Sequence, residues 1–373
     1  MTTQDVLIVS AATGTGHMRA AEALRGALAL RDPGQVAEHV DLLELAPRWV
    51  RAAYGDGYEL MATRAPRLWR EVYRRTDALD ADRARWGPIA QRILFREFRR
   101  LLLSRRWSVC VCTHFLPGQL AASGPGFPPF ALVITDLTLH HYWAQPRVQR
   151  YFVATEALAD EVRHRVPGAQ IQATGIPIAP KFAAAPSRAE ARRALGLDRS
   201  RPVALVMGGG LGLGVAEGVE AAVGAQVDGI QIVAVCGRNH AAAGRLRGAG
   251  LPEDRLRVLD YSDRVEQLIA AADIVVTKPG GLTTSEALAL GRPLLLTRPI
   301  PGQEEGNTRV LTASGSALAA ADPAALRHML EHAFNEPGVL AQLAASARRC
   351  GRPYAAQNIA GAIRRDYVLD IAA

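Results

Sequence analysis

Cysteine is scarce in this sequence, and the four cysteines present lack the spacing that a metal site or a redox pair needs. Cys110 and Cys112 are separated by one residue, whereas the redox motif has two residues between its cysteines. Cys236 and Cys350 stand alone in the second half of the chain. We therefore expect buried thiols in a reducing cytoplasm.

Long apolar runs are also missing. None approaches the roughly 20 residues that a bilayer-spanning helix requires. The N-terminus has no basic segment in front of an apolar stretch, so a signal peptide is not expected. The composition, 49% hydrophobic and 21% charged, is typical of a globular chain that is soluble or peripheral to a membrane, and 373 residues favour two domains.

Lysine is nearly absent, so arginine carries the positive charge of the chain. Lys181 and Lys278 are the only lysines. The segment 47–107 has an excess of eight positive charges, as large as that of the whole chain, and it contains four of the five tryptophans. This clustering needs an explanation beyond overall composition.

Three interpretations of the segment 47–107 are open. A nucleic-acid interface would use the charge, but no recognisable reader motif accompanies it, and we expect no nucleic-acid partner. A pair of solvated helices would need no partner at all. A membrane-surface patch explains both components, because arginine attracts anionic headgroups and tryptophan prefers the interface. We favour this patch, and its candidate residues are Trp49, Trp69, Arg70 and Trp86.

Apolar, β-branched runs alternate with helical patterns along both halves of the chain. Such alternation predicts two α/β domains with parallel sheets, joined by a linker near 177–182. Ligands of these sheets bind beyond the carboxyl ends of the strands. The loops that follow the strands are therefore where candidate site residues are sought.

The first such loop contains two glycines and a histidine. Gly14 and Gly16 fit the start of the dinucleotide fingerprint, but the position of the third glycine is Arg19. No Gly-Lys-Ser/Thr follows, so the loop is not a Walker A motif either. It is either a tight turn between strand and helix or a turn that places His17 against an acceptor hydroxyl or a phosphate.

The segment 277–291 predicts an anion site. Lys278, Gly280 and Gly281 lie between a strand and a helix for which Thr283 and Thr284 are N-cap candidates. Free backbone N–H groups and the helix dipole favour a phosphate there. Glu286 then either accepts ribose hydroxyls or is an ordinary acidic residue of the first helical turn.

Further polar or glycine-rich loops follow other strands of the second half. Gln303 and Glu304 are expected on a loop and suit sugar hydroxyls, although a solvated helix start would look the same. The glycine turns at 207–210 and 236–239 end two strands. Arg238 either neutralises phosphate or is a solvated surface residue.

A carboxylate follows a buried strand in the first half. Asp136 is either a general base facing the cleft or a helix N-cap, and His140, His141 and Trp143 come shortly after it. No spacing here resembles a three-ligand metal site. The acids Asp80 and Asp82 lie in the arginine-rich segment and are interpreted as surface charge.

Together these stretches resemble the family of monogalactosyldiacylglycerol synthases and processive diacylglycerol glucosyltransferases, a relative of the lipid-II-forming N-acetylglucosaminyltransferase. The resemblance spans nearly the whole chain in the same order. The matching residues are Gly14-Thr15-Gly16-His17, Thr135-Asp136 with His140 and Trp143, YFVAT at 151–155, TGIPI at 174–178, CGRN at 236–239, KPGGLTTSEAL at 278–288 and PGQEEGN at 301–307. The sequence departs from the family at Thr15, Met18 and His141, all on the acceptor side.

The resemblance implies an α/β protein of the GT-B class, with two Rossmann-like parallel-sheet domains and an interdomain cleft. The implied domains are an acceptor- and membrane-facing domain at 1–176, a UDP-sugar-binding domain at 177–354 and a C-terminal helix at 355–373 that crosses back. The implied activity is transfer of a hexose from a UDP-sugar to a lipid, foremost diacylglycerol, with inversion at the anomeric carbon. The implied location is cytoplasmic, peripheral at the anionic inner face of the cell membrane.

Site roles also follow from the resemblance. Asp136 is the leading candidate for the base, and His17 is its competitor. The implied acceptor- or diphosphate-side residues are Gly14, Thr15, Gly16, His140 and Trp143. The implied donor-binding residues are Gly209, Gly210, Arg238, Tyr261, Lys278, Gly280, Gly281, Thr283, Glu286, Gln303, Glu304 and Asn307. The UDP-sugar is a substrate, and neither a cofactor nor a metal is implied.

Two rival functions are kept. A nucleotide-sugar 2-epimerase on the same fold would need several carboxylates in the cleft and no membrane patch. A non-catalytic sensor would bind a UDP-sugar and report on metabolism through a partner. Turnover that requires added lipid separates the transferase from both.

Overall fold

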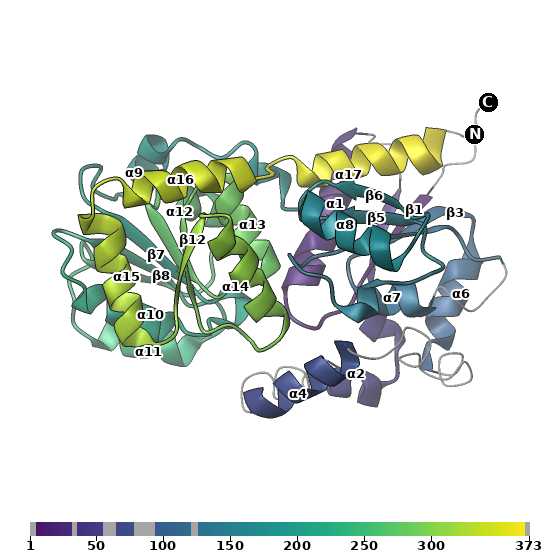
Figure 1. Ribbon diagram of the computed structural model, residues 1–373, viewed down its shortest axis with the longest axis horizontal. Helices are drawn as coiled ribbons and strands as arrows, with labels where there is room; N and C mark the ends of the chain where they lie inside the picture. The colour runs from purple at the N-terminus through teal and green to yellow at the C-terminus, as the bar shows by residue number, and fades with distance from the viewer. Residues whose placement is uncertain (1–4, 32–35, 55–64, 78–93, 121–125, 370–373) are drawn as a thin grey trace. The chain divides into compact units, whose positions relative to one another are not determined.

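The computed structural model of the protein describes residues 5–31, 36–54, 65–77, 94–120 and 126–369. The chain divides into two compact units (Figure 1). Unit 1 consists of Met1–Pro180, Ile300–Gln303 and Tyr354–Ala373, and unit 2 consists of Lys181–Pro299 and Glu304–Pro353. The domain limits at 176 and 354 stay a prediction.

Unit 1 contains one sheet of six strands, and all of its strand pairs are parallel. The spatial order is β2-β1-β3-β4-β5-β6. The strands are β1 (Asp5–Ser10), β2 (Ala37–Asp41), β3 (Trp107–Cys112), β4 (Phe130–Val133), β5 (Arg150–Val153) and β6 (Gln170–Ala173). Burial of β1, β4 and β5 on both faces explains the apolar runs at 6–9, 130–133 and 151–153.

Helices α1 (Gly16–Arg31) and α17 (Ala355–Ile363) share one hydrophobic core with this sheet. The core joins Leu24 and Leu28 to Ile359 and Ile363, although hundreds of residues separate the two helices in the chain. The remaining helical elements of unit 1 are η1 (Leu42–Leu45), α2 (Arg48–Tyr54), α4 (Pro66–Asp77), α6 (Arg96–Ser104), α7 (Phe115–Leu120), η3 (His141–Trp143), α8 (Glu156–Arg165) and the π-helical η6 (Arg364–Leu369).

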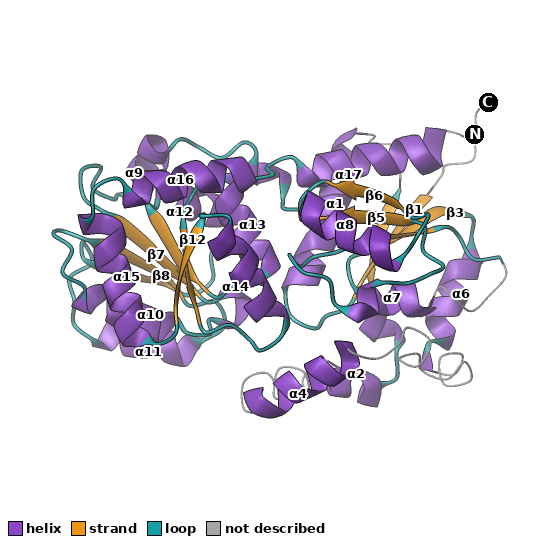
Figure 2. Ribbon diagram, viewed as in Figure 1, coloured by secondary structure: helices purple, strands orange, loops and turns teal. Residues whose placement is uncertain are grey.

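Unit 2 contains a second parallel sheet of six strands, in the order β12-β11-β10-β7-β8-β9. Strands are drawn in orange in Figure 2, where β7, β8 and β12 of this sheet are labelled. The strands are β7 (Val203–Met207), β8 (Gln231–Val235), β9 (Leu256–Leu259), β10 (Ile274–Thr277), β11 (Leu294–Thr297) and β12 (Ala317–Ala320). The expected α/β class with parallel sheets is confirmed. The sequence analysis missed β12, whose alanine-rich segment lacks the β-branched residues that mark the other strands.

Helices pack against the sheet of unit 2, and α10 and α15 contribute more buried residues to its core cluster than the other helices do. The helical elements are η4 (Pro180–Phe182), α9 (Arg188–Leu195), η5 (Gly209–Leu211), α10 (Val215–Gly224), α11 (His240–Gly248), α12 (Val265–Ala271), α13 (Gly281–Ala289), α14 (Gln303–Ala313), α15 (Pro323–Asn335) and α16 (Val339–Cys350). Two of these elements, η4 and α14, begin in unit 1, at Pro180 and Gln303, and continue in unit 2.

The arginine-rich segment forms helices where the structure describes it. Trp49 is 60% exposed and Arg70 is exposed, whereas Trp69 is half-buried and Trp107 belongs to the core. The predicted membrane residue Trp86 and the acids Asp80 and Asp82 lie outside the described residues. Across the described parts of the chain, no helix is both long enough and apolar enough to cross a bilayer.

Candidate active site

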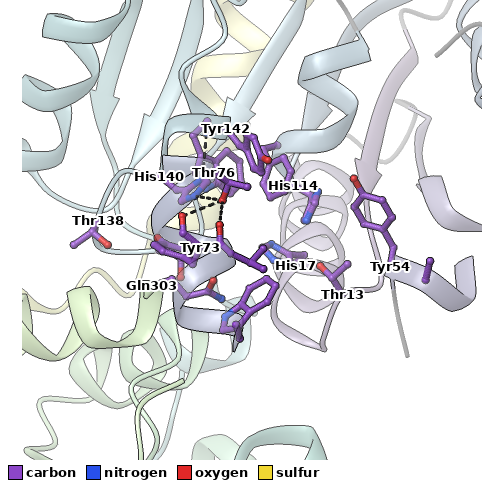
Figure 3. Close-up of a pocket in the computed structure, with 16 residues that line it drawn as sticks. Thr13, His17, Tyr54, Tyr73, Thr76, His114, Thr138, His140, Tyr142 and Gln303 are labelled. Carbon is purple, nitrogen blue, oxygen red and sulfur yellow. Dashed lines mark hydrogen bonds between the residues drawn. The ribbon is translucent and has the colours of Figure 1, made fainter. Parts of the chain in front are cut away.

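Three strands of unit 1 end at one cavity. His17 follows β1, His114 follows β3 and Asp136 follows β4, and all three line a cavity of about 300 Å³. Figure 3 labels His17 and His114 at this cavity. Six of the thirteen other lining residues are tyrosine, tryptophan or phenylalanine. These six are Tyr54, Trp69, Tyr73, Phe115, Tyr142 and Trp143, and the others are Thr13, Ala53, Val72, Thr76, Thr138, His140 and Gln303.

Backbone geometry determines which nitrogen of His17 carries a proton. His17 Nδ1 lies 2.8 Å from the Thr113 carbonyl oxygen, and a carbonyl can only accept a hydrogen bond. Nδ1 is therefore the donor, and Nε2 keeps its lone pair. The Thr135 hydroxyl, also 2.8 Å from Nδ1, holds the ring from a second side.

The electrostatic surroundings keep this imidazole neutral at neutral pH. Burial lowers the pKa of His17 below its ordinary value, while the charge of Asp136 and the hydrogen bond to Thr113 oppose that shift. Asp136 is half-buried and follows β4 by three residues. Neutral His17 can thus accept a proton, and Asp136 favours the cation that results.

Asp136 does not cap a helix in the structure, so the N-cap alternative is wrong. The chain bends after Asp136, and the next helix, η3, is capped by His140, whose Nδ1 accepts the N–H of Tyr142 at 3.2 Å. Asp136 is therefore left at the cavity, where the general-base hypothesis placed it.

His114 is a cavity residue that the sequence analysis missed. Its Nδ1 accepts the backbone N–H of Leu116 at 3.1 Å, and its ring meets the His17 ring edge-on, with the centroids 4.7 Å apart. Burial, and then the neighbouring His17, hold the pKa of His114 well below its ordinary value. The position of His114, between a strand and a helix, could have identified it from the sequence. Asp136 was identified from a similar position after a strand.

Helix α4 forms one wall of the cavity. The Tyr73 ring packs against the His140 ring, with the centroids 4.4 Å apart and the planes tilted by 56°, and the Asp77 carboxylate accepts the His141 N–H at 2.9 Å. Burial lowers the pKa of His140, with the charge of Asp77 acting in the opposite direction. The aromatic side of α4 is thereby attached to η3, as Figure 3 shows for Tyr73, Thr76 and His140.

The strap 300–303, which comes from between β11 and α14, closes another part of the wall. Gly302 has φ +93°, and a Cβ there would lie 2.5 Å from the Tyr73 ring. Gln303 lines the cavity of unit 1. Gln303 and Glu304 begin α14, so their expected placement on a loop is wrong, while their role in holding sugar hydroxyls stays a prediction.

Lys278 and Glu304 form an ion pair in unit 2. Glu304 is 3% exposed, so the lysine compensates a carboxylate that has lost its water. Asn307 is buried beside them and donates to the Pro279 carbonyl at 3.0 Å, which ties α14 to the loop before α13. Three of the predicted donor residues therefore form one connected group.

The N-cap prediction for this loop is wrong. Helix α13 begins at Gly281 with Gly280 as its N-cap, and the Thr284 hydroxyl bonds back to the Gly280 carbonyl at 2.9 Å. Thr283 and Thr284 thus lie inside the helix, because a glycine without a capping side chain starts it. Glu286 is 1% exposed on the same helix.

The two glycine turns of unit 2 interlock. The Arg238 N–H donates to the Gly210 carbonyl at 3.0 Å, and a Cβ on Gly212 would lie 1.9 Å from the Cys236 carbonyl oxygen. Close approach of the two loops is one reason for these glycines. Gly209 neighbours the Lys278 side chain, while Arg238 and Tyr261 are exposed, and their donor roles stay predictions.

The loop before His17 needs glycine for its backbone shape. Gly14 has φ +99°, and an added Cβ would meet nothing within 4 Å. The positive φ therefore favours glycine at this position, whereas the surrounding space would accommodate a Cβ. Thr15 is exposed and Gly16 opens α1, one residue before His17.

Two family models match successive parts of the chain. Residues 17–178 match the monogalactosyldiacylglycerol (MGDG) synthase family, and residues 203–342 match the glycosyltransferase family 28 C-terminal domain. A processive diacylglycerol beta-glucosyltransferase of Bacillus pumilus is 36% identical over 208 residues, which are 54% of this chain and 53% of the relative. The chain thus spans about half the length of the curated relatives that it matches first.

Solved structures share the fold across the chain. MurG of Acinetobacter baumannii has a TM-score of 0.61 at 16% identity and covers 97% of this chain and 99% of its own. A UDP-GlcNAc 2-epimerase from Neisseria meningitidis, bound to UDP-GlcNAc, has a TM-score of 0.62 at 13% identity and covers 97% and 100%. These likenesses confirm the GT-B fold class.

Proposed function

We propose that this chain, which is similar to the monogalactosyldiacylglycerol synthase family and to processive diacylglycerol beta-glucosyltransferases, is an inverting glycosyltransferase that moves a hexose from a UDP-sugar to diacylglycerol at a membrane surface. The observation that carries the proposal is the proton-accepting Nε2 of His17 at an aromatic-lined cavity beside Asp136. An apolar cavity with a few polar groups suits a lipid that ends in one reactive hydroxyl.

The reaction is a single displacement. His17 Nε2 takes the proton of the lipid hydroxyl while its oxygen attacks the anomeric carbon of the sugar. The bond between that carbon and the UDP oxygen breaks, UDP leaves with the electron pair, and the configuration inverts. Asp136 would stabilise the imidazolium that forms, so in this proposal His17 is the base and Asp136, the leading base candidate from the sequence, is its charge partner.

The donor half of the mechanism belongs to unit 2. The diphosphate of the UDP-sugar would lie at the backbone N–H groups that open α13, aided by Arg238. Glu286 would accept hydrogen bonds from the ribose hydroxyls. Glu304 would accept hydrogen bonds from the hydroxyls of the transferred sugar once its ion pair with Lys278 opens. Gly209, Gly210 and Tyr261 would border the nucleotide.

The membrane part of the proposal rests on α2 and α4. Trp49 is 60% exposed and Leu68 is 57% exposed, and exposed arginines accompany them. Apolar side chains among arginines suit an anionic lipid surface, such as the inner face of a cell membrane. Residues of α2 and α4 also line the cavity. A lipid acceptor could therefore enter the cavity from a membrane surface that these two helices contact.

A nucleotide-sugar 2-epimerase is the second candidate, favoured by the fold shared with the Neisseria enzyme. That likeness is one of fold alone, because the identity is 13%. The 36% identity to a diacylglycerol glucosyltransferase favours the transferase.

The test supplies diacylglycerol in anionic mixed micelles together with UDP-glucose, UDP-galactose or UDP-N-acetylglucosamine, and analyses both lipid and nucleotide by mass spectrometry. The expected product is a hexosyl-diacylglycerol, formed roughly 100-fold or more slowly by His17→Gln. A changed sugar on UDP without added lipid would indicate the epimerase. UDP-sugar binding without any product would indicate the sensor.

A further inference from the structure

We propose that His114 is an acceptor-binding residue, whose Nε2–H donates a hydrogen bond to the lipid hydroxyl oxygen that His17 deprotonates. This inference rests on the proposed function for the identity of the acceptor. The geometry of the two histidines carries it.

The first step is the tautomer of His114. Its Nδ1 lies 3.1 Å from the Leu116 nitrogen and accepts the N–H of that residue, which belongs to the first turn of α7. An acceptor nitrogen carries no proton, so in the neutral ring the proton sits on Nε2. Protonation of Nδ1 would break this bond and place a cation at a helix N-terminus, which the helix dipole disfavours.

The second step is the direction of the two rings. His114 and His17 both line the cavity, and each has its Nδ1 engaged with protein backbone. Among the described residues, neither Nε2 has a hydrogen-bond partner. The side of each ring that carries Nε2 is therefore the side left for a ligand.

The third step is complementarity. His17 Nε2 is an acceptor and His114 Nε2 is a donor, on rings whose centroids are 4.7 Å apart. A hydroxyl group needs both partners, because its hydrogen donates and its oxygen accepts. With the hydrogen held by His17 and one lone pair by His114, the second lone pair is free to attack the sugar.

Two substitutions separate this role from a structural one. In His114→Asn, the side-chain oxygen replaces Nδ1 as the helix cap, but nothing replaces the Nε2 donor. In His114→Gln, the amide nitrogen reaches the Nε2 position, while the cap is lost. A residue that only caps α7 would tolerate asparagine, and a residue that only binds the hydroxyl would tolerate glutamine.

The measurement uses two ligands with the full-length protein. Calorimetric Kd values are determined for dioctanoylglycerol and for the dioctanoyl diester of propanediol, which lacks the hydroxyl. We expect the wild type and His114→Gln to prefer the hydroxylated ligand by about fivefold, the ordinary contribution of one hydrogen bond. We expect His114→Asn to lose most of that preference while its melting temperature stays at the wild-type value, and His114→Gln to melt earlier.

An unchanged preference in His114→Asn would overturn the proposal, as would equal loss of preference in both variants. The absence of any preference in the wild type would do so as well. Failure of the proposed transferase activity is a separate result, since it appears as a missing glycolipid in the product assay and leaves these binding ratios measurable.

Discussion

At the scale of single residues, the proposed transfer depends on the protonation state of His17. In the proposed mechanism His17 acts as the base, which requires a neutral ring, and the charge of Asp136 raises the pKa of His17 against the effect of burial. Transfer should therefore fail as the pH falls below the pKa of His17, which lies under the ordinary value of 6.5.

Asp136→Asn should move that acidic limb of kcat/KM to lower pH, because the carboxylate that favours the imidazolium is gone. Its kcat should fall by roughly 10- to 100-fold, since the cation formed in the transition state loses its partner. The measurement is a pH–rate profile of glycolipid formation between pH 4.5 and pH 8. Total loss of activity at every pH would instead make Asp136 the base.

Gly302 offers a second test at this scale. Gly302→Ala should loosen the strap 300–303, because the new Cβ would lie 2.5 Å from Tyr73 and φ is +93°. Hydrogen exchange of the strap amides should speed up at least about fivefold, the lower end of the usual overpacking cost of about 1–3 kcal/mol. Gly168→Ala is the matched control, with φ +84° and nothing within 4 Å. Both variants share the strain of a positive φ, and only Gly302→Ala adds a steric clash. An equal increase in local hydrogen exchange in the two variants would therefore contradict the packing argument.

The sequence allowed some of these residues to be predicted. His17 and Asp136 follow apolar strands, so their place at the sheet edge could be inferred from local pattern. The partners of His17 could not be predicted in this way, because Thr113 and His114 follow a strand that is about a hundred residues further along the chain. Gln303 was unpredictable as a cavity residue for the same reason.

At the scale of elements, α4 has two different sides. Tyr73 and Thr76 face the cavity, while Leu68 and several arginines are exposed. A pair of helices was one interpretation of this segment from the sequence, but only the contacts of Asp77 and Tyr73 with η3 show which side of α4 forms the cavity wall.

The double variant Trp49→Ala/Leu68→Ala should bind phosphatidylglycerol vesicles about tenfold or more weakly, because two apolar side chains no longer enter the interface. Leu30→Ala is the matched control, since Leu30 is 72% exposed on α1, outside this segment. Vesicle co-sedimentation at two salt concentrations measures the effect. Equal weakening by the control would speak against a specific membrane face.

Boundaries of elements were harder to predict than their existence. The start of α13 at Gly281 was missed because two threonines looked like better caps than a glycine. The strand β12 was missed because alanine favours helices in isolation, and its place beside β11 is decided by pairing with a distant segment.

At the scale of the whole molecule, unit 1 should be sensitive to acid. Burial lowers the pKa of four histidines in this unit, His17, His39, His114 and His140. The unfolded chain binds protons near pH 6.5 and the folded unit does not, so this stabilisation is complete above pH 6.5 and declines below it.

The expected result is a lower melting temperature of unit 1 at pH 5.5 than at pH 7.5. All five tryptophans lie in unit 1, so their fluorescence follows its unfolding. His114→Asn keeps the cap and cannot take up a proton, and it should reduce the difference between the two pH values. If the melting temperature of this variant falls between pH 7.5 and pH 5.5 by as much as that of the wild type, His114 does not contribute to the acid sensitivity.

The return of α17 to unit 1 has a consequence for how the protein is made. Ile359 and Ile363 belong to the core of the first sheet, yet all of unit 2 is synthesised between β6 and α17. On the ribosome, unit 2 can complete its sheet while the apolar face of α1 still awaits its cover. The half that would bind the lipid is therefore the last to mature, and it is the half that a chaperone would meet unfinished.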